Sequence, residues 1–190
     1  MHFAKFAAAS AALFMLVACE TTSTAPYSPS TQNVLALQSA FAPTSSKISV
    51  GDFTAPDTVD STPACRAAGP LDMTQGKGIP AYIKEAFQQE LFLAQAYAGD
   101  APVTVKATVD RAVVSTFGTG AWEIDLSISS NVSAGYKVST AYSFSSSFSA
   151  VSACRNASDA FAPAIRELLA KVIADPGFKA LTTPPAALGS

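Results

Sequence analysis

Apolar and polar residues alternate along three stretches in the second half of the chain. These stretches are 103–110, 122–129 and 136–149. Gly-containing segments separate them and predict turns. Period-two alternation predicts an antiparallel meander with one face covered and the other in solvent. An earlier stretch, 47–53, also alternates at Ile48 and Val50 and predicts a fourth strand.

Helical spacing of apolar residues marks two further segments, 80–97 and 158–174. The stripe of the first is formed by Ile83, Phe87, Leu91 and Ala94. The stripe of the second is formed by Phe161, Ile165, Leu168 and Val172. Pro163 is unfavourable inside a helix, so the regular part is predicted to begin one residue before it. The segment 34–43 is either a short helix or a packed arm.

The order of these elements is β-α-β-β-β-α. This order predicts an α+β fold, a two-layer sandwich in which a four-stranded sheet carries two helices on one face. We expect a single domain over 34–181 and a loose tail over 182–190. A long loop at 54–78 joins the first strand to the first helix, and both helices begin at the same end of the sheet.

The first residues have the features of an export signal. An uncharged apolar stretch at 6–18 is too short to span a membrane, which requires about 20 residues. The stretch ends in Leu16-Val17-Ala18-Cys19, which resembles the lipobox of bacterial lipoproteins. The resemblance implies that 1–18 is a signal peptide and that Cys19 carries lipid.

The residues that follow predict how the domain is attached. Ser, Thr and Pro dominate 19–33, which is typical of a flexible tether. Glu20 follows the Cys, and Glu at this place does not resemble the inner-membrane retention signal that Asp would. The resemblance therefore favours the outer membrane, facing the periplasm, with the inner membrane as the alternative. The expected partners are the membrane, through the lipid, and another envelope protein.

Two further cysteines, Cys65 and Cys154, lie in the predicted domain. The periplasm is oxidising, and each Cys lies near the start of one predicted helix, so both belong to the same end of the sheet. We therefore predict a disulfide between them. The alternative is two separate buried thiols.

Composition and charge narrow the function. Charged residues make up only 14% of the chain and the formal net charge is -2, which excludes the basic footprint of a nucleic-acid-binding protein. The only His is His2, inside the predicted signal peptide, so the mature chain lacks the imidazole used by Ser or Cys nucleophiles and by His-based metal sites. No enzymatic activity, cofactor or metal is expected.

Two groups of residues remain candidates for binding. Arg66 and Arg155 directly follow the two Cys and are possible contacts for an anion or a partner, the alternative being Arg that binds surface or loop groups. The apolar sheet face carries an aromatic group that forms either a ligand groove or ordinary core. This group contains Trp122, Tyr142, Phe144 and Phe148.

The lipobox, the element order and the closing stretch at 164–181, A-x-x-E-L-L-A-K-V-I-A-D-P-x-F-x-x-L, resemble small outer-membrane lipoproteins of the YajG type. The resemblance to LptE-like lipoproteins is looser. Both resemblances imply a cellular location and a fold, and neither implies a specific chemical activity. We therefore expect a non-enzymatic, lipid-anchored lipoprotein that is a scaffold or accessory subunit of an envelope assembly or transport system. The alternative is a carrier of a small hydrophobic or lipid ligand between helices and sheet.

Overall fold

The structure is a computed structural model that describes residues 26–184. The predicted signal peptide and Cys19 lie outside these residues. Within 26–184, no helix combines the length and the apolar character needed to cross a membrane.

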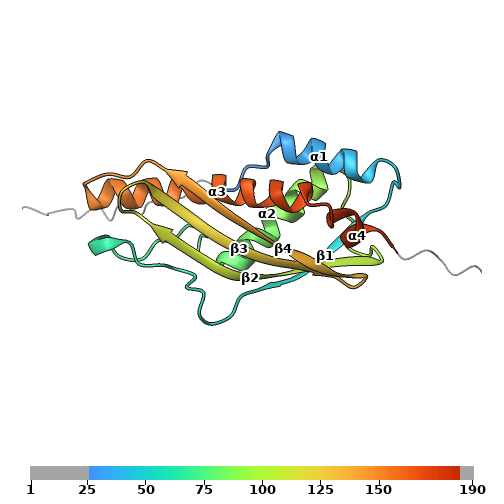
Figure 1. Cartoon of the computed structure of the whole chain (residues 1–190), viewed down its shortest axis with the longest axis horizontal. Helices are drawn as coiled ribbons and strands as arrows, with labels where there is room; N and C mark the ends of the chain where they lie inside the picture. Colours follow the sequence, from blue (N-terminus) through green and yellow to red (C-terminus); the bar gives the residue numbers. More distant parts are fainter. Residues whose placement is uncertain (1–25, 185–190) are drawn as a thin grey trace, which may run out of the picture.

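A four-stranded sheet forms one layer of the molecule (Figure 1). Its strands are β1 (Ile48–Thr54), β2 (Val103–Ser115), β3 (Gly120–Ser130) and β4 (Ser133–Phe144), in that spatial order. β1 pairs with β2 in parallel, and the other two pairs are antiparallel. The predicted meander is therefore confirmed, with β2 running further than its clean alternation suggested.

Helices cover one face of this sheet. α2 (Ile79–Leu93) packs on β1 and β2, and α3 (Ala150–Ala174) packs on β3 and β4. α1 (Thr31–Phe41) contacts α2 and α3 from outside, and the short α4 (Phe178–Thr182) closes the end of the sheet (Figure 1). The α+β sandwich is thus confirmed. The described residues contain two α-helices besides the two predicted ones, and α1 settles the segment 34–43 as a helix rather than a packed arm.

The core between sheet and helices is built around aromatic side chains. The Trp122 ring lies 4.9 Å from that of Phe161, which in turn lies 5.2 Å from that of Tyr82. The indole N–H of Trp122 donates to the Ala157 carbonyl at 2.8 Å, so its one polar group is satisfied although the side chain is fully buried. These contacts tie β3, α2 and α3 together.

Helix α3 begins earlier than predicted and contains Pro163. The prediction that the regular helix starts one residue before Pro163 was wrong, because the helix starts at Ala150. Pro163 costs about 3 kcal/mol inside a helix because its N–H is missing and its ring crowds the preceding turn. Here the preceding turns are held independently: Ser149 caps the helix through the Ser152 N–H, and Cys154 and Ala157 are buried.

The boundaries of the predicted tether and tail also need correction. Tyr27 is packed on the domain and α1 begins at Thr31, so the tether does not extend to residue 33. Thr182 is buried at the end of α4, so it belongs to the domain rather than to a loose tail. In both places the polar residues predicted an unpacked segment. They are packed instead, because Ser, Thr and Asn side chains here cap helices and bind buried groups.

The aromatic group on the sheet is split by the structure. Trp122 is fully buried, Tyr142 and Phe144 are half-buried, and Phe148 is fully exposed beyond the end of β4. The Phe144 ring covers Gly120 on the neighbouring strand, and a Cβ at Gly120 would lie 2.3 Å from this ring. Phe148 is therefore not part of the core, because β4 stops before it.

Candidate functional site

The disulfide lies at the end of the molecule where α3 begins. Cys65 and Cys154 are joined, with their Cα atoms 5.9 Å apart, as the sequence predicted. Cys154 lies in the first turns of α3, and Cys65 immediately precedes the short 3₁₀ helix η1 (Arg66–Ala68). The bond therefore fastens the long β1–α2 loop to the helical layer.

The loop around Cys65 is also held by its own backbone. The Cys65 N–H donates to the Gly69 carbonyl at 2.8 Å, and the Leu71 N–H donates to the Pro63 carbonyl at 3.0 Å. Arg66 has a φ of 47°, in the left-handed region that non-glycine residues rarely occupy. This conformation is kept because the bonds on both sides of Arg66, and its side chain, hold it in place.

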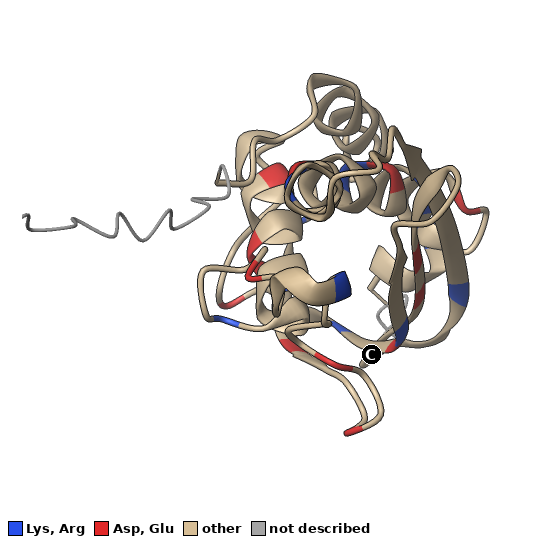
Figure 2. Ribbon diagram, turned by 90° about the vertical axis from the view of Figure 1, so that its left-hand side faces the viewer, with Lys and Arg blue, Asp and Glu red and all other residues tan. Residues whose placement is uncertain are grey.

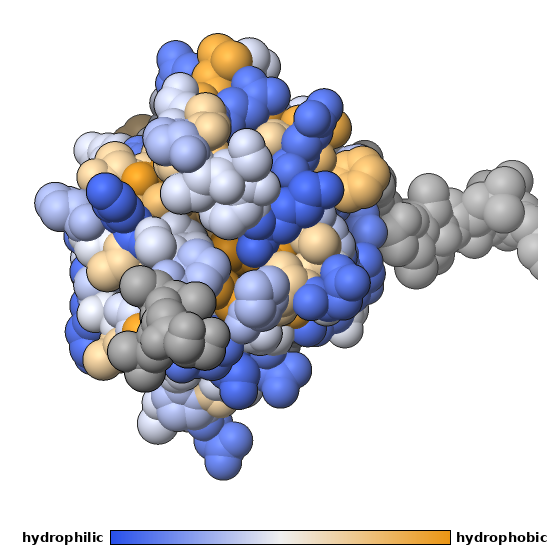
Figure 3. All heavy atoms as spheres, turned by 90° about the vertical axis from the view of Figure 1, so that its right-hand side faces the viewer, coloured by the Kyte–Doolittle hydropathy of each residue, from blue (hydrophilic) through white to orange (hydrophobic). Residues whose placement is uncertain are grey.

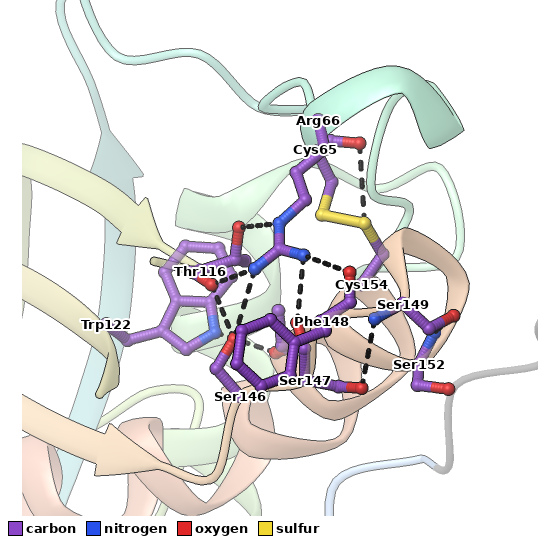
Figure 4. The surroundings of a disulfide bond; sticks show 11 residues. Cys65, Arg66, Thr116, Trp122, Ser146, Ser147, Phe148, Ser149, Ser152 and Cys154 are labelled. Carbon is purple, nitrogen blue, oxygen red and sulfur yellow. Dashed lines mark hydrogen bonds between the residues drawn. A yellow bond between two sulfur atoms is a disulfide. The ribbon is translucent and has the colours of Figure 1, made fainter. Parts of the chain in front are cut away.

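The Arg66 side chain reaches across to two other loops (Figure 4). Its Nε donates to the Thr116 hydroxyl at 3.1 Å, and one Nη donates to the Ser147 carbonyl at 2.9 Å and the Phe148 carbonyl at 3.4 Å. The other Nη donates to the Thr116 carbonyl and to the Ser146 hydroxyl. One guanidinium thus joins the β1–α2 loop, the β2–β3 turn and the β4–α3 loop.

Two exposed aromatic side chains surround this guanidinium. Phe117 is 74% exposed, and its ring centre lies 5.0 Å from the Arg66 guanidinium carbon. Phe148 is fully exposed on the opposite loop. They line a cavity of about 380 Å³ together with Arg66, Gly118, Ser146 and Ser147. We call this set the aromatic end.

The structure does not bring Arg66 and Arg155 into one cavity. Arg155 lines a separate hollow of about 250 Å³ with Cys154, Ser158 and residues 68–72. All the N–H groups of Arg66 face protein acceptors, so an incoming anion would have to displace them. The geometry therefore favours the loop-binding alternative for Arg66. The role of Arg155 stays a prediction.

Acidic residues of the described chain form no group of three or more that could hold a metal ion. Glu123 pairs with Arg111 on the outer sheet face, where both side chains are about half exposed. Seen from the end where α3 begins, acidic and basic residues are dispersed over both layers (Figure 2). The opposite end shows mainly hydrophilic residues interspersed with smaller hydrophobic areas (Figure 3).

A second polar cluster lies under the N-terminal arm, which we define as residues 26–30. Glu90 on α2 is fully buried. Its Oε1 accepts from the Tyr27 hydroxyl at 2.5 Å, the Ser30 N–H at 3.2 Å and the Asn33 amide at 3.1 Å. Its Oε2 has no hydrogen-bond partner among residues 26–184. One carboxylate therefore fixes the arm and the start of α1 to the domain.

Burial shifts the titration of this cluster. Desolvation raises the pKa of the Glu90 carboxyl, although the Tyr27, Ser30 and Asn33 bonds and the charge of Arg166 pull it down. Desolvation and the adjacent Glu90 also raise the pKa of the Tyr27 phenol, so Tyr27 remains a hydrogen-bond donor. The Arg166 guanidinium donates to the Ser28 carbonyl at 3.2 Å and gives the arm a second attachment.

Sequence reasoning missed Glu90, Asn33 and Phe117, and it placed Phe148 on the apolar face of the sheet. The spacing of Glu90 held a signal, because it lies three residues after Phe87 and within the buried stripe of α2. Asn33 likewise precedes the buried Leu37 and Phe41 at helical intervals. Exposure of Phe148 had a weaker signal, the Ser residues at 145–147 that end the strand pattern.

Comparison with known proteins identifies no family for this chain. No family model matches the chain, and no curated protein matches it. A solved structure, that of protein XCC0632 from Xanthomonas campestris, described by the family model DUF330, is similar at 15% identity and a TM-score of 0.45. The match covers 67% of this chain and 83% of that one. This neighbour belongs to a bacterial family, and the likeness is too distant to carry any argument about function.

Proposed function

We propose that this protein is a non-enzymatic, lipid-anchored envelope lipoprotein whose aromatic end binds another envelope protein. The observation that carries the proposal is the pair of exposed rings, Phe117 and Phe148, on loops that Arg66 and a disulfide hold together. Exposed aromatic residues beside an Arg are typical of the centre of a protein interface. Rigid support lowers the ordering cost of binding.

The lipid anchor rests on the sequence resemblance. Leu16-Val17-Ala18-Cys19 resembles a lipobox, and lipid at Cys19 would hold the domain at a membrane surface. The disulfide of the domain is consistent with an oxidising compartment. We propose the outer membrane, facing the periplasm, because the residue after Cys19 is Glu20 and not the Asp of an inner-membrane retention signal.

The alternative of a ligand carrier between helices and sheet has less support. The rings that would line such a site pack on one another. Trp122 and Phe161 are in contact, and both side chains are buried. The cavity of about 380 Å³ at the aromatic end and a hollow of about 550 Å³ beside α2 both open at the surface. A partner surface therefore fits the geometry better than an internal ligand site.

The test is site-specific photocrosslinking in intact cells. A photoreactive residue at Phe148 should give one adduct of defined mass, and the same residue at the exposed Val113 on the sheet should not give it. Phe117→Ser should reduce the Phe148 adduct. Equal adducts at both positions, or none at Phe148, would contradict partner binding at the aromatic end.

A further inference from the structure

A groove of about 550 Å³ lies on the side of the molecule where the N-terminal arm meets α2. Pro29, Phe92 and Leu93 supply its apolar lining, and Glu85, Gln88 and Gln89 complete it. Phe92 is 68% exposed and Leu93 is 52% exposed. Two large neighbouring side chains thus face solvent at the last turn of α2, away from the aromatic end.

The course of the chain places this groove beside the predicted lipid. Glu90 and Arg166 fix the arm, so Pro29 is held against the groove. Only six residues, 20–25, separate Cys19 from Pro26, the first described residue. Fully extended, the seven steps from Cys19 to Pro26 span at most about 25 Å. The groove must therefore stay close to the surface in which an acyl chain on Cys19 is inserted.

We infer that the Pro29–Phe92–Leu93 groove docks on the phospholipid bilayer and sets the orientation of the domain. This inference rests on the proposed lipidation of Cys19. The charge near the groove is compatible with lipid, because the Glu85 carboxylate is paired with Lys77 at 2.7 Å. Apolar side chains at a membrane surface insert to the boundary of headgroups and acyl chains, about 5–10 Å deep.

The buried carboxylate is the residue that makes this orientation specific. A free arm would allow the domain to rotate about residue 33, whereas the arm bound to Glu90 leads the chain out at the groove. Glu90 acts here as a positioning residue: it does not contact lipid, and it fixes which face the tether presents to the membrane.

The experiment uses the full-length lipoprotein, purified from membranes and reconstituted in phosphatidylcholine vesicles with brominated acyl chains. Trp122 is the only Trp and is fully buried, so it gives a constant background. Phe92→Trp adds a reporter in the groove, and Phe148→Trp adds a matched reporter at the aromatic end. Bromine near the headgroups should quench the added Phe92→Trp fluorescence, because an inserted ring lies only about 5–10 Å deep, and should leave Phe148→Trp unchanged. Glu90→Ala in the Phe92→Trp chain should reduce the quenching.

The outcomes separate the two claims. Mass spectrometry of the N-terminal peptide and vesicle flotation report lipid on Cys19 independently of the fluorescence. A lipidated, vesicle-bound protein with no quenching at Phe92→Trp, or with equal quenching at both reporters, would overturn the docking and leave the anchor intact. Absence of lipid on Cys19 would overturn both.

Discussion

Two parts of this molecule attach a non-regular segment to the same core in different ways. At the aromatic end, a covalent bond and an Arg with five directed donors hold three loops. Under the N-terminal arm, one buried carboxylate collects donors from Tyr27, Ser30 and Asn33. We expect the first attachment to be insensitive to pH, because a disulfide has no titrating proton and a guanidinium stays protonated, and to be broken by a reductant. The second contains no redox-active group but carries a charge that burial disfavours.

The two kinds of attachment suit the two functions that we propose. A surface that binds a protein partner benefits from loops that do not rearrange, because ordering them on contact weakens binding. An arm that leads to a lipid anchor must resist pulling along the chain. Glu90 binds the arm at Tyr27 and Ser30 and the start of α1 at Asn33.

Removing the disulfide should have the largest effect on stability. The bond closes a sequence separation of 89 residues. In the chain-entropy model, a loop of this size contributes about 4–5 kcal/mol. The double variant Cys65→Ala, Cys154→Ala should lose about that much unfolding free energy in urea. Reductant should lower the wild-type midpoint and leave that of the variant unchanged, and a variant as stable as the oxidised wild type would refute the prediction.

Truncation of the buried carboxylate comes next. Glu90→Ala leaves the Tyr27 hydroxyl and the Asn33 amide without their buried acceptor, and we expect a loss of about 2–3 kcal/mol. The arm should also become accessible to proteases at 26–33. Tyr27→Phe is the matched control, because it removes one donor and should cost only about 1 kcal/mol. Equal losses for the two variants would show that Glu90 does not organise the arm.

The sequence allowed prediction of the elements whose burial is periodic. The alternation in β2 to β4 and the stripes of α2 and α3 identified the sandwich, and the placement of Cys65 and Cys154 at one end identified the disulfide. These features follow from local periodicity and from the chain order of the elements.

The candidate sites were less predictable because they depend on contacts between distant segments. Glu90 lies 63 residues from Tyr27, and Arg66 lies 50 residues from Thr116. A Glu in a helix and an Arg in a loop are ordinary surface residues until the partners are known. Phe148 was misassigned because it lies an even number of residues after Phe144, in phase with the apolar face, although the strand itself ends at Phe144.

Replacing the guanidinium should have a smaller effect than truncating Glu90. Arg66→Lys keeps the charge but cannot reach the carbonyls of Thr116 and Ser147 together. We expect a loss of about 1–2 kcal/mol in urea unfolding, because the site is half-buried and water can replace some of the bonds. Arg111→Lys, in the exposed pair with Glu123, is the control and should change stability by less than about 0.5 kcal/mol. Indistinguishable variants would mean that Arg66 does not hold the loops.

The pH dependence of the arm should change the unfolding free energy least. It is also the effect that depends on Glu90 alone. Burial raises the pKa of the Glu90 carboxyl, so the folded protein holds this proton more tightly than the unfolded chain. The contribution of Glu90 to stability is therefore fully present below the ordinary carboxyl pKa and is lost as the pH rises through the raised value. Glu90→Gln lacks this titration and keeps an acceptor oxygen.

The measured quantity is the unfolding free energy of Glu90→Gln minus that of the wild type, taken from urea curves across this pH window. It should increase from acidic to neutral pH, because only the wild type loses stability there. Both proteins carry Glu167, whose pKa the Thr140 hydroxyl lowers, so its opposite contribution cancels in the difference. A difference that stays constant with pH would show that the Glu90 carboxyl keeps its ordinary pKa. The donors from the arm would then offset the burial completely, and the two attachments would be equally insensitive to pH.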